Sequence, residues 1–279
     1  SGHTSFKIGG PADILVLPES IEQLREVLKV VKETVVPLTL LGNGSNVLVR
    51  DKGIRGIVIK LGNMLRHFYE AEDLLVFGSG YSLALASYKA MECGKTGMEF
   101  AVGIPGSIGG AVYMNAGAYD GEMQNIVNCV KVMDLQGNER VLTAEELNFG
   151  YRKTSLQNSG LIVTEVTLKM PSGDKDEIKS KMDDFSHRRI SKQPLEMPSA
   201  GSMFKRPPGY FAGTLIDQAG LKGYTVGGAQ ISTKHAGFVV NVGGATAADV
   251  LQLIKDVQTK IKAGVGVELQ PEVLVIGEE

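Results

Sequence analysis

The chain has 279 residues, of which 43% are hydrophobic and 22% charged, as in a globular protein and unlike a disordered one. Its 29 Lys and Arg nearly balance 31 Asp and Glu, which argues against a nucleic-acid partner. No apolar run approaches the ~18 residues of a membrane span, and the start lacks a signal-peptide pattern, so we expect a cytoplasmic protein without a membrane partner.

The first expected unit covers residues 1–62. The run Ser20-Ile21-Glu22-Gln23 matches a capping box and predicts the start of a helix. Short apolar runs predict strands at residues 13–17, 38–41, 47–49 and 57–59. The sequence therefore predicts a strand, a helix and then further strands in this unit.

Two further units are expected, at residues 63–192 and 193–279. The pattern Leu135-Gln136-Gly137-Asn138 predicts a hairpin turn, and Thr143-Ala144-Glu145-Glu146 matches a second capping box. Apolar periodicity predicts strands at 74–77, 127–134, 139–142, 161–170, 229–231, 238–241 and 272–276, and helices at 82–94, 174–190, 212–220 and from 246. The expected fold class is α+β, with α and β mixed.

Glycine is the unusual component of this chain. There are 35 glycines, roughly an eighth of all residues, against an ordinary ~7%. Glycine allows a positive φ and a close approach of backbone to a ligand. We therefore expect a large ligand that lies against glycine-rich loops. Metal binding is not expected, because the two Cys and four His show no ligand spacing.

Two loops are candidates for that ligand. The first exposes backbone N–H groups that can bind a diphosphate, and a strand rather than a helix follows it, which disfavours a Rossmann fold. Ser107 of the second loop is expected to begin a short helix. The alternatives are a tight hairpin and a glycine-lined packing site. The candidate residues are Leu41, Gly42, Asn43, Gly44, Ser45 and Asn46, and then Gly103, Ile104, Pro105, Gly106, Ser107, Gly109, Gly110, Asn115, Gly117 and Ala118.

Three single residues outside these loops could carry chemistry. Arg152 stands beside an aromatic residue, Ser202 follows a glycine in a turn, and Glu272 lies within an apolar run. Each has a plain alternative: a surface Arg, a turn Ser, and an edge-strand Glu that faces water. The surroundings of Ser202 lack the pattern of a hydrolase nucleophile.

Nine stretches, in order along essentially the whole chain, match one known family. They are residues 4–12, 41–48, 103–119, 151–152, 188–194, 201–207, 221–229, 235–241 and 272–273. Together they resemble the UDP-N-acetylenolpyruvoylglucosamine reductases, FAD enzymes of bacterial cell-wall synthesis. The resemblance implies an FAD-binding fold of the vanillyl-alcohol-oxidase (PCMH) type with an additional C-terminal α/β domain that binds substrate.

The resemblance also implies a reaction. Non-covalently bound FAD would carry hydride from NADPH to UDP-N-acetylglucosamine enolpyruvate, giving UDP-N-acetylmuramate. By family motif, Arg152 and Glu272 stabilise the enolate and Ser202 donates the proton. The two glycine loops would hold FAD, and a monomer is expected. Weaker candidates for substrate contacts are Lys192, Lys205, Lys222 and His235.

The chain departs from parts of the family pattern. Residues 153–187 leave no room for a Tyr-bearing loop found in one branch, so the chain resembles the shorter branch. Thr154 and Leu274 stand where many members carry Ser and Arg. One alternative is another flavin oxidase acting on a sugar or alcohol, although no His lies in the glycine loops. Another is a non-catalytic nucleotide-sugar-binding module, against which the presence of all three candidate catalytic residues argues.

Overall fold

The structure is a computed structural model that describes residues 1–61 and 65–279. The chain forms two compact units: unit 1 comprises Ser1–Ile14, Gly44–Arg55 and Ile190–Glu279, and unit 2 comprises Leu15–Asn43 and Gly56–Arg189. The boundary predicted between residues 62 and 63 lies outside the described residues, and the division into three parts stays a prediction. No helix in the described part of the chain could cross a membrane.

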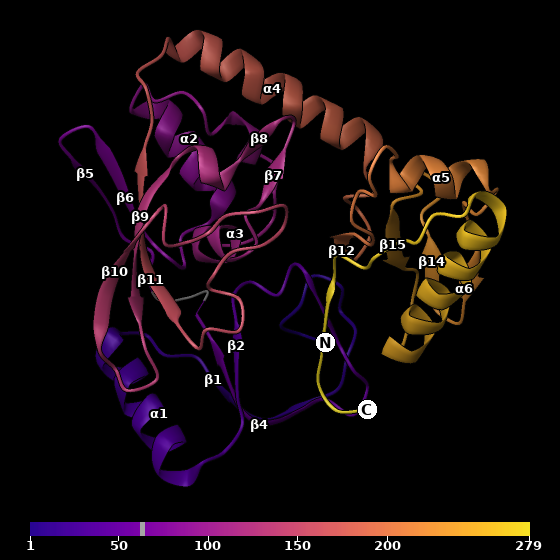
Figure 1. The fold of residues 1–279 in the computed structure, drawn as a ribbon, viewed down its shortest axis with the longest axis horizontal. Coiled ribbons are helices and arrows are strands. Elements are labelled where there is room, and N and C mark those ends of the chain that lie inside the picture. Colours follow the sequence, from indigo (N-terminus) through magenta and orange to yellow (C-terminus); the bar gives the residue numbers. More distant parts are fainter. Residues whose placement is uncertain (62–64) are drawn as a thin grey trace. The chain divides into compact units, whose positions relative to one another are not determined.

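An antiparallel five-stranded sheet forms the centre of unit 2 (Figure 1). The hairpin predicted at residues 135–138 is confirmed: the carboxylate of Asp134 accepts the N–H groups of Gln136 and Asn138 at 2.8 and 2.9 Å, which closes the turn. The strands, in sheet order, are β10 (Glu139–Thr143), β9 (Val127–Met133), β11 (Ile162–Lys169), β6 (Leu74–Gly78) and β5 (Phe68–Ala71).

The core of unit 2 lies between this sheet and two helices, α2 (Leu83–Glu92) and α3 (Ile108–Tyr113). Phe77 and Val166 from the sheet are completely buried and belong to the same cluster as Leu83 of α2. Burying side chains of this size stabilises the fold by about 1.5–3 kcal/mol each. The core therefore fixes α3, and with it the second glycine loop, on the sheet.

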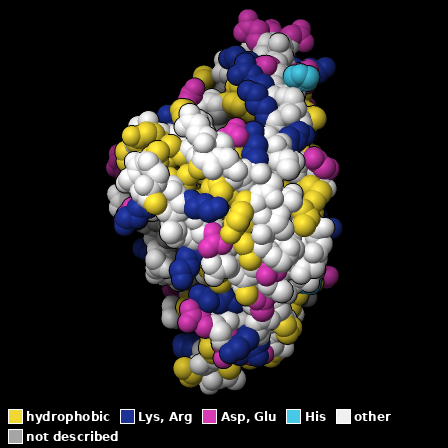
Figure 2. Space-filling view, turned by 90° about the vertical axis from the view of Figure 1, so that its right-hand side faces the viewer, with side chains coloured by type: hydrophobic (Ala, Val, Ile, Leu, Met, Phe, Trp, Pro, Cys, Tyr) yellow, Lys and Arg dark blue, Asp and Glu magenta, His cyan; other side chains and the backbone are white. Residues whose placement is uncertain are grey.

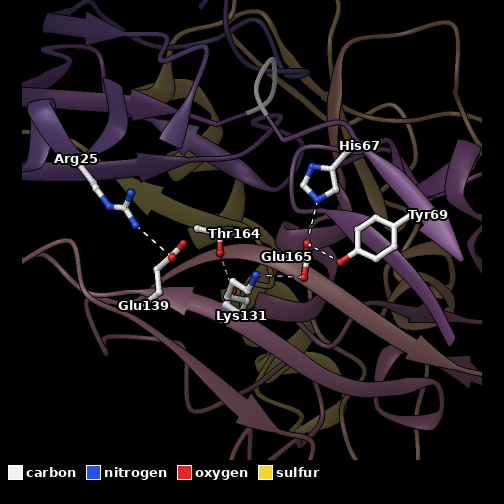
Figure 3. Close-up of polar contacts among 7 residues, drawn as sticks. All are labelled: Arg25, His67, Tyr69, Lys131, Glu139, Thr164 and Glu165. Atoms are coloured by element: carbon white, nitrogen blue, oxygen red, sulfur yellow. Dashed lines mark hydrogen bonds and ion pairs between the residues drawn. The ribbon is translucent and has the colours of Figure 1, made fainter. Parts of the chain in front are cut away.

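A polar network follows the other face of the same sheet (Figure 3). Successive side chains of a strand point to opposite faces, so Glu165 points away from the core that Val166 enters. The Glu165 carboxylate lies 3.1 Å from Nε2 of His67, accepts the hydroxyl of Tyr69 at 3.3 Å, and pairs with Lys131 at 3.6 Å. Burial and the neighbouring Glu165 raise the pKa of Tyr69. These contacts tie β5, β9 and β11 together.

Helix α1 (Ile21–Thr34) begins where the sequence predicts. The Ser20 hydroxyl accepts the N–H of Gln23 at 3.2 Å. The Gln23 side chain accepts the N–H of Glu19, at 2.8 Å, rather than that of Ser20, so the box closes one residue earlier than the motif predicts. Arg25 of this helix pairs with Glu139 of β10 at 3.2 Å (Figure 3).

Helix α1 packs on a small sheet whose strand order is β1-β4-β2. Strands β2 and β4 are parallel, and Leu24 and Leu28 of the helix share a cluster with Ile57 and Ile59 of β4. The strands are β1 (Ala12–Val16), β2 (Leu38–Leu41) and β4 (Ile54–Lys60). The predicted strand–helix–strand pattern is confirmed.

The second capping box forms its hydrogen bonds but starts no helix. Thr143 donates its N–H to the Glu146 carboxylate at 2.8 Å, and the N–H of Glu146 donates to the Thr143 hydroxyl at 3.4 Å. Asn148 then adopts a left-handed conformation, with φ 43°. Such a residue ends a helical turn, so the motif closes one turn only.

Unit 1 is built on a second antiparallel sheet, with two helices in its core. Helix α6 begins with a capping box formed by Thr246 and Asp249, and the carboxylate of Asp51 accepts the N–H groups of Ala247 and Ala248 at 2.7 and 2.9 Å. The elements are β12 (Ser199–Ser202), β15 (Phe238–Asn241), β14 (Ala229–Ile231), β13 (Thr225–Val226), α5 (Ala212–Gln218) and α6 (Ala247–Val265).

The remaining elements are short, apart from one long helix. Strands β3 (Val47–Val49) and β16 (Leu274–Ile276) form a parallel pair, and β7 (Gly117–Ala118) pairs with β8 (Gly121–Glu122). Helix α4 (Lys175–Lys192) carries the chain from unit 2 into unit 1. On the face drawn in Figure 2, Lys and Arg are interspersed with Asp and Glu, as the balanced charge predicts.

Candidate functional site

The two glycine loops meet at Ser107. A Cβ on Gly42 would lie 3.2 Å from the Ser107 hydroxyl oxygen, and one on Gly110 would lie 3.4 Å from the same atom. Apart from the chain neighbours and, for Gly110, the backbone of its own helix, no other atom of the described residues lies within 4 Å of either position. Side chains at these two positions would fill this space, so both glycines leave room for a ligand against backbone. The arrangement fits the FAD that the sequence predicts here.

Three other glycines of the second loop are explained by packing within the protein. A Cβ on Gly103 would lie 2.5 Å from Cδ of Arg189, and one on Gly109 would lie 2.7 Å from Cβ of Ser79. A Cβ on Gly117 would lie 2.6 Å from the carbonyl oxygen of Gly121. The packing alternative therefore accounts for the glycine at these positions, and their contact with FAD stays a prediction.

Two residues beside this loop have no role assigned to them by the sequence analysis. The Ser79 hydroxyl is buried and has no hydrogen-bond partner among the described residues, which leaves a donor beside Gly109. Arg189 is buried against Gly103, with its guanidinium 5.8 Å from the ring centre of Tyr119, and burial lowers its pKa. The only signals in the sequence are the small residues around Ser79 and the pair Arg188-Arg189.

Asn115 holds the second loop from inside. Its side chain is fully buried; Nδ2 donates to the Glu122 carboxylate and the Gly150 carbonyl oxygen, both at 3.0 Å. Its Oδ1 accepts the N–H of Gln124 at 3.0 Å. The amide therefore joins the loop to the turn that carries Arg152, and direct contact with FAD stays a prediction.

Arg152 is held on the second loop by its own side chain. The guanidinium donates to the carbonyl oxygens of Gly117 at 3.0 Å and Asn115 at 3.4 Å. The residue has φ 55° in a tight turn in which Gly150 and Lys153 exchange backbone hydrogen bonds. A non-glycine residue in this conformation costs about 1–2 kcal/mol, and such strain gathers at functional positions.

Ser202 and Glu272 lie on paired segments of unit 1. The N–H of Glu272 donates to the carbonyl oxygen of Met203 at 2.9 Å, and the N–H of Lys205 donates to that of Gln270 at 2.8 Å. Ser202 is exposed and Glu272 is half-buried. The structure therefore brings together the segments of two predicted catalytic residues. Arg152 belongs to unit 2, so its approach to them stays a prediction.

The strand expected at residues 272–276 begins two residues later. The observed strand β16 starts at Leu274, so Glu272 precedes it and is not a member of the parallel pair with β3. The strand pattern fails here because the backbone of Glu272 is bonded to Met203 and Asn46 instead of to a neighbouring strand. The carboxylate thus avoids the cost of burial in a central strand.

Three of the four candidate substrate residues, Lys192, Lys222 and His235, lie near one another. Burial lowers the pKa of His235 below its ordinary value of 6.5. A backbone hydrogen bond and the charge of Asp217 oppose this shift in pKa, and the charges of Lys222 and Lys192 add to it. Nδ1 of His235 accepts the N–H of Gly237 at 3.1 Å, so the proton of the neutral ring is on Nε2. Lys222 pairs with Asp217 at 2.8 Å. Lys205, the fourth, lies on the segment of Ser202.

Two family models match this chain. The one described as "FAD binding domain" matches residues 12–143, and the one described as "UDP-N-acetylenolpyruvoylglucosamine reductase, C-terminal domain" matches residues 193–276. These matches confirm the expected fold, an FAD-binding domain followed by a C-terminal domain of this family.

Similar proteins cover the chain from end to end. The UDP-N-acetylenolpyruvoylglucosamine reductase of Clostridium perfringens is 52% identical over 100% of this chain and 91% of its own length. That of Geobacillus thermodenitrificans is 51% identical over 99% and 91%. The solved structure of UDP-N-acetylenolpyruvylglucosamine reductase from Thermus caldophilus has a TM-score of 0.84 and 40% identity, covering 98% of this chain and 96% of that one. Similarity of this extent shows that the chain belongs to the UDP-N-acetylenolpyruvoylglucosamine reductase family.

Proposed function

We propose that this chain is an FAD-dependent oxidoreductase that uses NADPH to reduce UDP-N-acetylglucosamine enolpyruvate to UDP-N-acetylmuramate, a precursor of peptidoglycan. The full-length match to reductases of this name carries the proposal. The sparse surroundings of Gly42 and Gly110, where a Cβ would approach the Ser107 hydroxyl oxygen at 3.2 and 3.4 Å, support FAD as the cofactor. A monomer that acts in the cytoplasm, without a nucleic-acid or membrane partner, completes it.

Bound FAD supplies the hydride chemistry between NADPH and the enolpyruvyl double bond. The residues of this chain must then stabilise the negative charge that develops on an enolate beside a carboxylate. Arg152 supplies the positive charge, and Glu272 completes the pair that stabilises the enolate. Ser202 donates the proton to the neighbouring carbon.

A serine hydroxyl is a weak acid, so Ser202 needs neighbours that stabilise its conjugate base. Lys205 follows it by three residues, and the backbone of Lys205 is fixed to Gln270 at 2.8 Å. Gly201 has φ 79°, which sets the turn that exposes the Ser202 side chain. Lys192, Lys222 and His235 form a group suited to the anionic parts of the substrate.

An anaerobic visible spectrum of the FAD-loaded protein tests the proposal. Addition of NADPH is expected to bleach the flavin, and addition of UDP-N-acetylglucosamine enolpyruvate is expected to restore its colour. Failure to bind FAD would overturn the proposal that this chain is a flavoenzyme. Bleaching without return would keep a flavoenzyme and discard this substrate.

The role of Ser202 is tested separately. Ser202→Ala is expected to leave reduction by NADPH unchanged and to slow the return of colour by about 10²–10⁴-fold, the usual contribution of a positioned acid. Ser199→Ala, on the same strand β12, is the matched control and is expected to keep the wild-type rate. Normal return of colour in Ser202→Ala would remove Ser202 as the proton donor.

A further inference from the structure

Asn46, the last residue of the first glycine loop, is bonded to the segment that carries Glu272. Its Nδ2 donates to the carbonyl oxygen of Glu272 at 3.3 Å, and its own carbonyl oxygen accepts the N–H of Leu274 at 3.1 Å. The N–H of Glu272 donates to Met203 at 2.9 Å. Both backbone polar groups of Glu272 are therefore held, one from the Ser202 segment and one from Asn46.

We propose that Asn46 is a positioning residue for Glu272, in addition to any contact it makes with FAD. The inference rests on the proposed function, because that function gives Glu272 its task. The side-chain amide of Asn46 fixes the backbone from which the Glu272 carboxyl group projects. The end of the FAD loop and the enolate-stabilising acid thus form one hydrogen-bonded unit.

The surroundings of Glu272 make this hydrogen bond important. Strand β16, which follows it, pairs with β3 over three residues, and Leu274 and Val275 are 40% and 36% exposed. Val273 is buried, so it anchors one side of the segment only. With few buried contacts, the position of Glu272 depends on polar contacts such as the one with Asn46.

The substitution Asn46→Asp separates this role from packing. Asp has nearly the same size but in its ionised form has no N–H to donate, and its oxygen would face the Glu272 carbonyl oxygen. A displacement of about 1 Å can slow a reaction about 10²-fold. We therefore expect Asn46→Asp to slow flavin reoxidation by the enolpyruvyl substrate about 10- to 100-fold. At saturating FAD, flavin reduction by NADPH is expected to slow much less than reoxidation, because Glu272 acts only in the second half-reaction.

Two measurements distinguish positioning from a direct FAD contact. Weaker FAD binding, with both half-reactions slowed in parallel, would show an FAD contact alone and overturn the proposal. In a double-mutant cycle, Asn46→Asp is expected to add no further slowing to Glu272→Gln, because the first residue acts through the second. If the two substitutions slowed reoxidation independently, so that their effects multiplied in the double variant, the positioning role of Asn46 would also be overturned.

Gln258→Ala is the matched control. The Gln258 side-chain amide donates to the carbonyl oxygen of Leu269 at 2.8 Å, so it holds the same segment three residues before Glu272. We expect Gln258→Ala to lower the Tm about as much as Asn46→Asp, and to leave reoxidation unchanged. Equal slowing in both variants would indicate general loosening and reject a specific role for Asn46.

Hydrogen exchange provides a readout that needs no substrate. Asn46→Asp is expected to speed exchange of the Glu272 and Leu274 amides in the FAD-loaded protein, and Gln258→Ala is expected to leave them near wild type. Unchanged exchange in Asn46→Asp would overturn the positioning role. Wild-type protein that is not reoxidised by the enolpyruvyl sugar would overturn the proposed function instead, and the exchange result would still decide the role of Asn46.

Discussion

The guanidinium of Arg152 donates a hydrogen bond to the carbonyl oxygen of Gly117 at 3.0 Å. A second N–H of the same group reaches the carbonyl oxygen of Asn115. One planar fork therefore anchors a predicted catalytic cation to two points of the second glycine loop. The ammonium of a lysine lacks this fork geometry.

Arg152→Lys is predicted to keep the positive charge at residue 152 but to lose the two hydrogen bonds that fix where this charge lies. We expect flavin reoxidation by the enolpyruvyl substrate to slow about 10- to 100-fold, since small displacements of a catalytic group are costly. Stopped-flow absorbance of the pre-reduced protein measures this rate. Lys153→Ala, at the exposed neighbouring position, is the control. A wild-type rate in Arg152→Lys would show that charge alone is sufficient.

The strained backbone at residue 152 predicts an unusual order of stability. Arg152 has φ 55°, which glycine adopts freely and alanine does not. Both Arg152→Gly and Arg152→Ala lose the same side-chain contacts, so their difference reports the backbone. We expect the glycine variant to be more stable by about 1 kcal/mol in urea denaturation. At Lys153, whose φ is not positive, glycine should give no such gain. Equal stability of the two Arg152 variants would mean that the backbone relaxes.

Two glycine-to-alanine substitutions should separate packing from ligand binding. Gly103→Ala places Cβ 2.5 Å from Cδ of Arg189, an overlap that we expect to destabilise the fold by about 1–3 kcal/mol. In Gly42→Ala, the new Cβ would approach the Ser107 hydroxyl oxygen at 3.2 Å and no other described atom beyond its chain neighbours, so the free energy of unfolding should change by less than about 0.5 kcal/mol.

Titration with FAD completes that comparison. Flavin fluorescence is expected to show weaker FAD binding in Gly42→Ala, because the new methyl group occupies the space left against the loop backbone. The apoprotein is compared by urea denaturation, so that bound FAD does not mask stability differences. Normal FAD affinity in Gly42→Ala would remove this glycine from the cofactor site.

His235 predicts a loss of stability in mild acid. Burial lowers its folded-state pKa below the ordinary 6.5, so the unfolded chain binds a proton more readily than the folded one. The stabilisation is therefore present above about pH 6.5 and is lost as the pH falls through that value toward the folded pKa. Protonation would also place a hydrogen on Nδ1, which now accepts the Gly237 N–H.

His235→Asn tests this dependence. Its side-chain oxygen can accept a hydrogen bond but does not titrate. We expect the free energy of unfolding to fall more steeply in the wild type than in His235→Asn between about pH 7.5 and about pH 5.5. The other three histidines are present in both proteins, so the comparison isolates His235. Parallel pH dependence of the free energy of unfolding in the two proteins would contradict the role of His235 in this loss of stability.

The sequence by itself determined the features that depend on neighbours within a few residues. The Ser20 hydroxyl caps α1, and Asp134 closes the predicted hairpin. The apolar runs that predicted β2 and β4 also proved reliable. The family followed from motifs in order along the chain, and the comparisons confirm it.

Tertiary structure decided which distant residues meet and what each glycine is for. Asn46 and Glu272 are 226 residues apart, and no local pattern pairs an amide with that carbonyl oxygen. The sequence predicts that Gly103 contacts the ligand, whereas the structure shows the Arg189 side chain packed against it. The left-handed turn at Arg152 is equally absent from the sequence, because its cost is offset by contacts with Gly117 and Asn115. Local propensity depends on neighbours within a few residues, whereas tertiary packing depends on contacts between distant parts of the chain. These positions are set by tertiary packing.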